Sequence, residues 1–149
     1  MSFSKWLYRY DDRTHDYDPE WDYEPHESPN KDMKGIVEKT VLEMREKLLP
    51  QLRLFKNFTV FYAAPHSLGG KLGRYSNGTV SEPVIVLDTE AIRGACEKYD
   101  LPVELGVETT IAHELAHAIQ EAEGLEDDEE QAEEFARQWH YNRTVTKLS

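Results

Sequence analysis

Two histidines that stand four positions apart restrict the conformation of one segment of this chain more tightly than any other feature. They occur in His113-Glu114-Leu115-Ala116-His117. Residues at this spacing lie one above the other on an α-helix, so the two imidazoles can reach one metal ion if the segment is helical. Glu114 projects about 100° further round such a helix. Its carboxylate can therefore reach a water beside the ion without competing for the ion itself.

The residues around this motif predict an amphipathic helix from Thr109 to Glu123, ended by Gly124 in the left-handed conformation. Its polar side carries the two histidines, Glu114 and Glu121. Its apolar stripe consists of Ile111, Leu115, Ala118, Ile119 and Ala122. One side of the helix can thus pack on a core while the other side opens on a cleft.

This arrangement predicts a site for one zinc ion, with His113 and His117 as ligands and Glu114 as general base. Zinc lowers the pKa of a bound water towards about 7, and the base takes its proton as the water attacks an amide carbonyl. We therefore expect a zinc-dependent peptidase that acts on a protein or peptide. Three alternatives stay open: surface histidines on an ordinary helix, hydrolysis of a non-peptide amide, and a structural or degenerate zinc site in an interaction protein, such as a virion or mobile-element accessory component.

A catalytic zinc site usually has three protein ligands, so the next predicted helix must supply one more. That helix packs through an apolar face made of Ala132, Phe135, Ala136 and Trp139. With Ala132 at zero, the helical wheel places Glu129 at about 60°, Glu133 at about 100° and Asp128 at about −40°. Glu129 is the predicted third ligand, and Asp128 and Glu133 are weaker candidates. His140, at about 80°, offers a site of three histidines instead.

The segment Glu129-Glu130-Gln131-Ala132-Glu133-Glu134-Phe135-Ala136 follows the motif after a short acidic linker. The motif and this segment together resemble the gluzincin metallopeptidases. They are most similar to the ImmA/IrrE-type peptidases, small enzymes of bacteria and mobile elements that cleave regulatory proteins. The resemblance implies a minimal zincin domain and, through the family's Glu-x-x-Ala-Asn-x-Phe-Ala pattern, Glu129 as third ligand.

The resemblance is confined to the C-terminal region, and this chain departs from the family pattern there. Glu133 stands where the family has Asn or Asp, and the linker after His117 is short. Arg137-Gln138-Trp139-His140 replaces the family's Leu-Leu-Met-Pro continuation. The residues therefore point to the zincin class more firmly than to that one family.

Hydrophobic spacing and turn residues predict the other elements and give the order helix, strands, then three helices, which is typical of an α+β domain. We expect a small mixed or antiparallel sheet, packed by the N-terminal helix and the motif helix. The predicted elements are a helix from Asn30 to Leu49, a strand Phe58–Ala63, a glycine-rich hairpin or loop Leu68–Tyr75, a strand Pro83–Leu87, a helix capped by Asp88 or Thr89 and ending at Tyr99, and a last helix Asp127–Tyr141.

We expect residues 1–30 to form an extended tail and residues 31–149 to form the folded domain. The tail has no helical or strand period, but it is rich in acidic and aromatic residues. Its aromatic residues are Trp6, Tyr8, Tyr10, Tyr17, Trp21 and Tyr23. Such a tail can pack loosely on the domain, dock on a partner, or occupy the cleft and hold an enzyme latent.

Composition limits the partners. The net charge of −12 repels nucleic acid backbones, so DNA or RNA binding is not expected. A single cysteine, Cys96, excludes internal disulfides and fits a reducing compartment. No stretch approaches the roughly 18 apolar residues of a membrane helix, so we expect no membrane partner and a cytoplasmic location.

Supporting roles for other residues are weaker predictions. An edge strand near the motif helix aligns the substrate in zincins generally, and Val84–Leu87 is a candidate. Tyr75, Arg74 and His66 are candidates to stabilise an oxyanion. Glu108 or Thr109 is a candidate to begin the motif helix and support a ligand imidazole.

Overall fold

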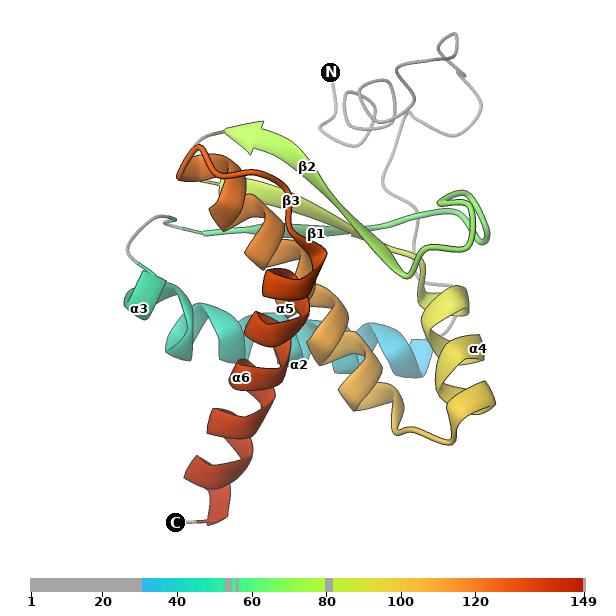
Figure 1. Cartoon of the computed structure of the whole chain (residues 1–149). Coiled ribbons are helices and arrows are strands. Elements are labelled where there is room, and N and C mark those ends of the chain that lie inside the picture. Colours follow the sequence, from blue (N-terminus) through green and yellow to red (C-terminus); the bar gives the residue numbers. More distant parts are fainter. Residues whose placement is uncertain (1–30, 53–54, 56, 80–81, 149) are drawn as a thin grey trace, which may run out of the picture.

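The computed structural model describes residues 31–52, 55, 57–79 and 82–148, and the predicted N-terminal tail lies outside them. The described part combines helices with one small sheet, which agrees with the predicted α+β class (Figure 1). The elements in chain order are α2 (Lys31–Lys47), α3 (Leu49–Leu52), β1 (Thr59–Tyr62), β2 (Gly73–Thr79), β3 (Glu82–Leu87), α4 (Thr89–Tyr99), α5 (Val103–Ala122) and α6 (Glu129–Leu148).

The sheet has three strands in the order β1-β3-β2 and is mixed. β3 lies in the centre, parallel to β1 and antiparallel to β2. The glycine-rich region predicted as a hairpin or loop is therefore only partly a loop, because β2 begins within it at Gly73. The prediction that Val84–Leu87 is an edge strand is wrong, because both sides of that strand are already paired.

The main core lies between the sheet and the helices. On β3, Ile85 and Leu87 point to this side and are fully buried. α5 contacts β2 and β3 on one side and α2 on the other, so it runs through the middle of the domain (Figure 1). α5 contributes Ile111 and Leu115 to the core, and α2 together with the residue that follows it contributes a buried stripe. That stripe is Met33, Val37, Val41, Met44 and Leu48.

α4 begins where the sequence predicts. Asp88 is its N-cap, and its carboxylate accepts a hydrogen bond from the backbone N–H of Ala91. The same carboxylate accepts one from the N–H of His66, so the buried aspartate ties the loop after β1 to the end of β3. His66 is exposed, and it is not among the residues that line the main cleft.

α5 begins at Val103, well before the predicted start at Thr109, and it contains Gly106 in its first turns. A Cβ at Gly106 would lie 2.5 Å from the sulfur of Cys96 and 3.0 Å from Ile92 Cγ2. The glycine is thus required by the close approach of α4 and not by a break in the helix. At the other end Gly124 has φ 71°, the predicted left-handed conformation.

Gly106→Ala is expected to lower the free energy of unfolding by about 1–3 kcal/mol, because α4 and α5 must separate to accept the methyl group. Gly94→Ala in α4 is the matched control. No atom would lie within 4 Å of its Cβ, so this change should raise the free energy of unfolding by about 0.5–1 kcal/mol. Urea unfolding followed by circular dichroism measures both values. Equal effects of the two substitutions would contradict the tight contact.

α6 is anchored to the rest of the domain at its far half. It packs through the predicted face, where Ala132, Ala136 and Trp139 are buried. Beyond this face His140 Nδ1 and Arg143 Nη1 lie 3.2 and 3.1 Å from Oε2 of the buried Glu108 on α5. Arg143 also binds Glu43 of α2. Within the described ranges, none of the helices is both long and apolar enough to cross a bilayer.

Candidate metal centre

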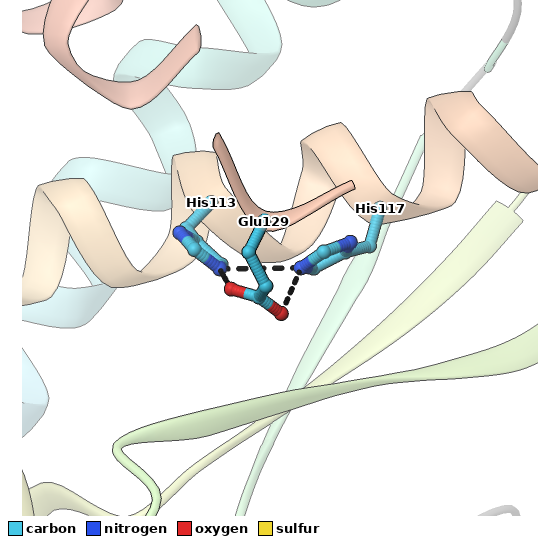
Figure 2. A group of neighbouring side chains, drawn as sticks. All are labelled: His113, His117 and Glu129. Carbon is cyan, nitrogen blue, oxygen red and sulfur yellow. Dashed lines mark hydrogen bonds and ion pairs between the residues drawn. The ribbon is translucent and has the colours of Figure 1, made fainter. Parts of the chain in front are cut away.

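The motif helix places both histidines on the side of α5 that faces the first turn of α6 (Figure 2). His113 and His117 are half-buried, and their Nε2 atoms lie 3.2 Å apart. The Glu129 carboxylate reaches both rings, with Oε2 at 2.9 Å from Nε2 of His113 and Oε1 at 3.1 Å from Nε2 of His117. Three side-chain donors from two helices thus converge on one point, with their ligand atoms within 4.8 Å of one another.

The spacing of these donors fits a tetrahedral zinc ion. Zinc–nitrogen distances of about 2.0–2.1 Å place the ligand atoms of a tetrahedral site about 3.3 Å from each other. The two Nε2 atoms lie 3.2 Å apart, and each lies 2.9 or 3.1 Å from a different oxygen of the Glu129 carboxylate, so these separations are close to that value. Two imidazoles and one carboxylate also form the donor set of many catalytic zinc sites. The residues present therefore fit the ion that the motif predicts.

The turn between α5 and α6 brings Glu129 back to the histidines. The left-handed Gly124 lets the chain reverse, and the N–H of Leu125 binds the carbonyl of Gln120. Asp128 then caps α6, since its carboxylate accepts a hydrogen bond from the N–H of Gln131. Glu129 is the first residue of α6, and it is the third-ligand candidate that the structure brings to the histidines.

The other candidates for the third ligand lie elsewhere. Asp128 is used as the helix cap, and His140 binds Glu108. Glu133 lines the same cleft, but among the described residues it does not belong to the metal-ligand cluster. Its position on the second turn of α6 explains this, because Glu129 already occupies the end of the helix closest to the two imidazoles.

Sequence reasoning missed the two groups that support His117. Its Nδ1 atom lies 2.6 Å from Oδ1 of Asp127 and 3.1 Å from Oε1 of Gln120. Burial lowers the pKa of His117, but the hydrogen bond to Gln120 and the charges of Asp127, Glu114 and Glu129 together raise it overall. Both partners are acceptors, so they favour the proton on Nδ1 and leave the lone pair of Nε2 for a metal. Gln120 follows His117 by three positions, a spacing that places the two side chains next to each other on a helix and could have indicated this contact.

Glu108 and Thr109 do not have the roles predicted for them. α5 begins before both residues. The Thr109 hydroxyl donates to the Leu105 carbonyl within the helix. Glu108 binds His140 and Arg143, so it anchors α6 and not a ligand imidazole.

Glu114 lies beside the candidate metal ligands, and its side chain faces β2. The backbone N–H of Tyr75 donates a hydrogen bond to its carboxylate. Burial raises the pKa of Glu114, while His113, His117 and the Tyr75 bond act in the opposite direction without cancelling the effect. A carboxylate with a raised pKa is a better proton acceptor than an exposed one, as a general base requires.

A cleft of about 810 Å³ is lined by the three candidate ligands, by Glu114 and by Asp127. β2 and the loop before it form one wall, α6 forms the other, and α5 forms the floor. Arg74 and Tyr75 line this cleft with the motif residues, so these two predicted oxyanion candidates stay close to the site. β2 is an edge strand of the sheet, which gives it the position that was predicted for Val84–Leu87.

Comparisons with protein-family models, with curated proteins and with solved structures each returned no match to this chain.

Proposed function

We propose that this protein is a zinc-dependent metallopeptidase that cleaves peptide bonds in a protein or peptide substrate. The observation that carries the proposal is the convergence of His113, His117 and Glu129 at ligand distances, with Glu114 beside them in an open cleft. A purely structural zinc site has no need of a buried carboxylate next to its ligands. The same geometry supports a gluzincin-type arrangement, in which the helix after the motif supplies the glutamate ligand.

His113 and His117 would hold the ion through Nε2, and Glu129 through its carboxylate. When bound, zinc supplies Lewis acidity, which polarises a carbonyl and acidifies water. Asp127 keeps the His117 ring oriented, because Nδ1 donates to its carboxylate. The half-burial of the imidazoles restricts water around the site, and this strengthens every electrostatic interaction within it.

Glu114 would act as the general base. Its carboxylate takes a proton from the attacking water and passes it to the leaving amine nitrogen as the carbon–nitrogen bond breaks, so the proton count balances. The N–H of Tyr75 holds the carboxylate in place through this exchange. Glu114 cannot easily act as an additional ligand, because its direction on the helix differs from that of the histidines.

β2 would bind the substrate backbone. It is an edge strand, and one of its N–H groups already reaches Glu114 on the floor of the cleft. An extended peptide that pairs with this edge would lie along the cleft, between β2 and α6. Pairing through the main chain places few demands on sequence, so side-chain preference would come from the walls of the cleft.

Removal and return of the metal test this function. The full-length protein is incubated with a panel of denatured proteins, before and after treatment with a zinc chelator, and fragments are detected by mass spectrometry. Cleavage should stop when the metal is removed, and one equivalent of Zn²⁺ should restore it. Zinc binding without any cleavage in the panel would favour an interaction protein with a structural site, and cleavage that survives chelation would contradict the proposal.

A further inference from the structure

Gln120 lies on α5 one turn beyond His117 and is buried, with 5% of its surface exposed. Its amide meets four partners. Oε1 accepts from the N–H of Asp128 at 3.1 Å and lies 3.1 Å from Nδ1 of His117. Nε2 donates to the carbonyl of Asp128 at 2.9 Å and to Oε1 of Gln131 at 3.4 Å. An amide side chain has two acceptor sites and two N–H groups, so every one of them is used.

These contacts fix the orientation of the amide. Oε1 must face the N–H of Asp128, and Nε2 must face its carbonyl, so a flipped amide would oppose donor to donor and acceptor to acceptor. The atom presented to His117 is therefore an acceptor, and the single N–H at Nδ1 of His117 is shared between it, at 3.1 Å, and the closer Asp127 carboxylate, at 2.6 Å. In the neutral ring the Nε2 atom of His117 then carries the lone pair, and it points to Glu129.

The same contacts fix the main chain immediately before Glu129. Gln120 binds both the N–H and the carbonyl of Asp128, as a neighbouring β-strand would. Asp128 caps α6, and Glu129 is the next residue. One buried side chain thus contacts one predicted ligand directly and the backbone next to another.

We propose that Gln120 is a positioning residue, which holds the His117 imidazole and Glu129 in their ligand positions before the metal binds. This inference rests on the proposed metal site. Preorganised ligands bind a metal more tightly, because the turn and the ring need not be ordered during binding. Supporting residues of this kind typically contribute about 10–100-fold to metal affinity.

The test is the Kd for Zn²⁺, measured on the full-length protein by competition with a chromophoric chelator. Gln120→Met keeps the length and helix propensity of the side chain but removes all four hydrogen bonds, and it should raise Kd by about 10–100-fold. Gln138→Met, on the exposed side of α6, is the matched control and should leave Kd unchanged. Circular dichroism of the metal-free proteins establishes that each variant is folded under the conditions of the titration.

Gln120→Glu provides a second variant, which retains acceptor oxygens for His117 and the N–H of Asp128 but loses both donors. It should raise Kd less than Gln120→Met does. The visible spectrum of bound Co²⁺ gives a second readout, since a tetrahedral site absorbs strongly and loses intensity when a ligand is displaced. We expect a weaker band in Gln120→Met.

A double-mutant cycle with Glu129→Ala separates the effect of Gln120 on His117 from its effect on Glu129. If Gln120 acts partly through the glutamate, Gln120→Met should cost less affinity when Glu129 is already alanine. Equal costs in both backgrounds would contradict that link, and an unchanged Kd in both Gln120 variants would overturn the whole inference. A wild-type protein that binds no Zn²⁺ would instead refute the proposed metal site itself.

Discussion

Glu114→Gln is expected to lower kcat/KM for peptide cleavage by about 10²–10⁴-fold, the usual contribution of a general base. The amide has the shape of the carboxylate, and its oxygen can still accept from the N–H of Tyr75, so the cleft should keep its form. An amide cannot take up a proton near neutral pH, so the attacking water would lose its base. The measurement is the rate of cleavage of one substrate from the panel, together with the zinc content of the variant.

Glu121→Gln on the exposed part of the same helix is the matched control, and it should retain both full activity and zinc. Loss of zinc in Glu114→Gln would mean that the side chain supports the site and is not only a base. Full activity in that variant would remove Glu114 from the mechanism.

Glu129→Ala is expected to raise the Kd for zinc by about 10²–10³-fold. Binding free energies of about 10–16 kcal/mol at four-ligand zinc sites give each ligand roughly 2.5–4 kcal/mol. Glu129 reaches both imidazoles, so its loss leaves two protein ligands. Isothermal titration of Zn²⁺ into the metal-free protein measures the change.

Glu133→Ala and His140→Ala are the matched comparisons, since the sequence offered both as alternatives to Glu129. Glu133 lies in the cleft outside the ligand cluster, and His140 is bound to Glu108, so neither change should affect Kd by more than about threefold. A large loss in either variant, with little change in Glu129→Ala, would reassign the third ligand.

Local periodicity was enough to predict the elements that carry the candidate ligands. The four-residue spacing of His113 and His117 places both side chains on one face of a helix. The apolar face of the next helix indicates the direction of Glu129 from the sequence alone. The cap at Asp88 and the left-handed Gly124 are likewise encoded in short segments. These features depend only on residues that are close in the sequence, so they can be predicted from the sequence.

Features that depend on distant residues were not predictable in this way. Parallel pairing of β1 with β3 leaves β2 at the edge, and no local pattern in Arg74 or Tyr75 indicates this. Gly106 interrupts the helical pattern, yet the contact with Cys96 explains it. The contacts of Gln120 with Asp128 exist only because the chain reverses between α5 and α6.

The most direct test of the central claim is an anomalous difference map at the zinc absorption edge, from crystals of the protein loaded with one equivalent of Zn²⁺. The account predicts a single strong peak about 2.0–2.2 Å from Nε2 of His113, Nε2 of His117 and a carboxylate oxygen of Glu129. No peak there, or one confined to the acidic turn before α6, would contradict it.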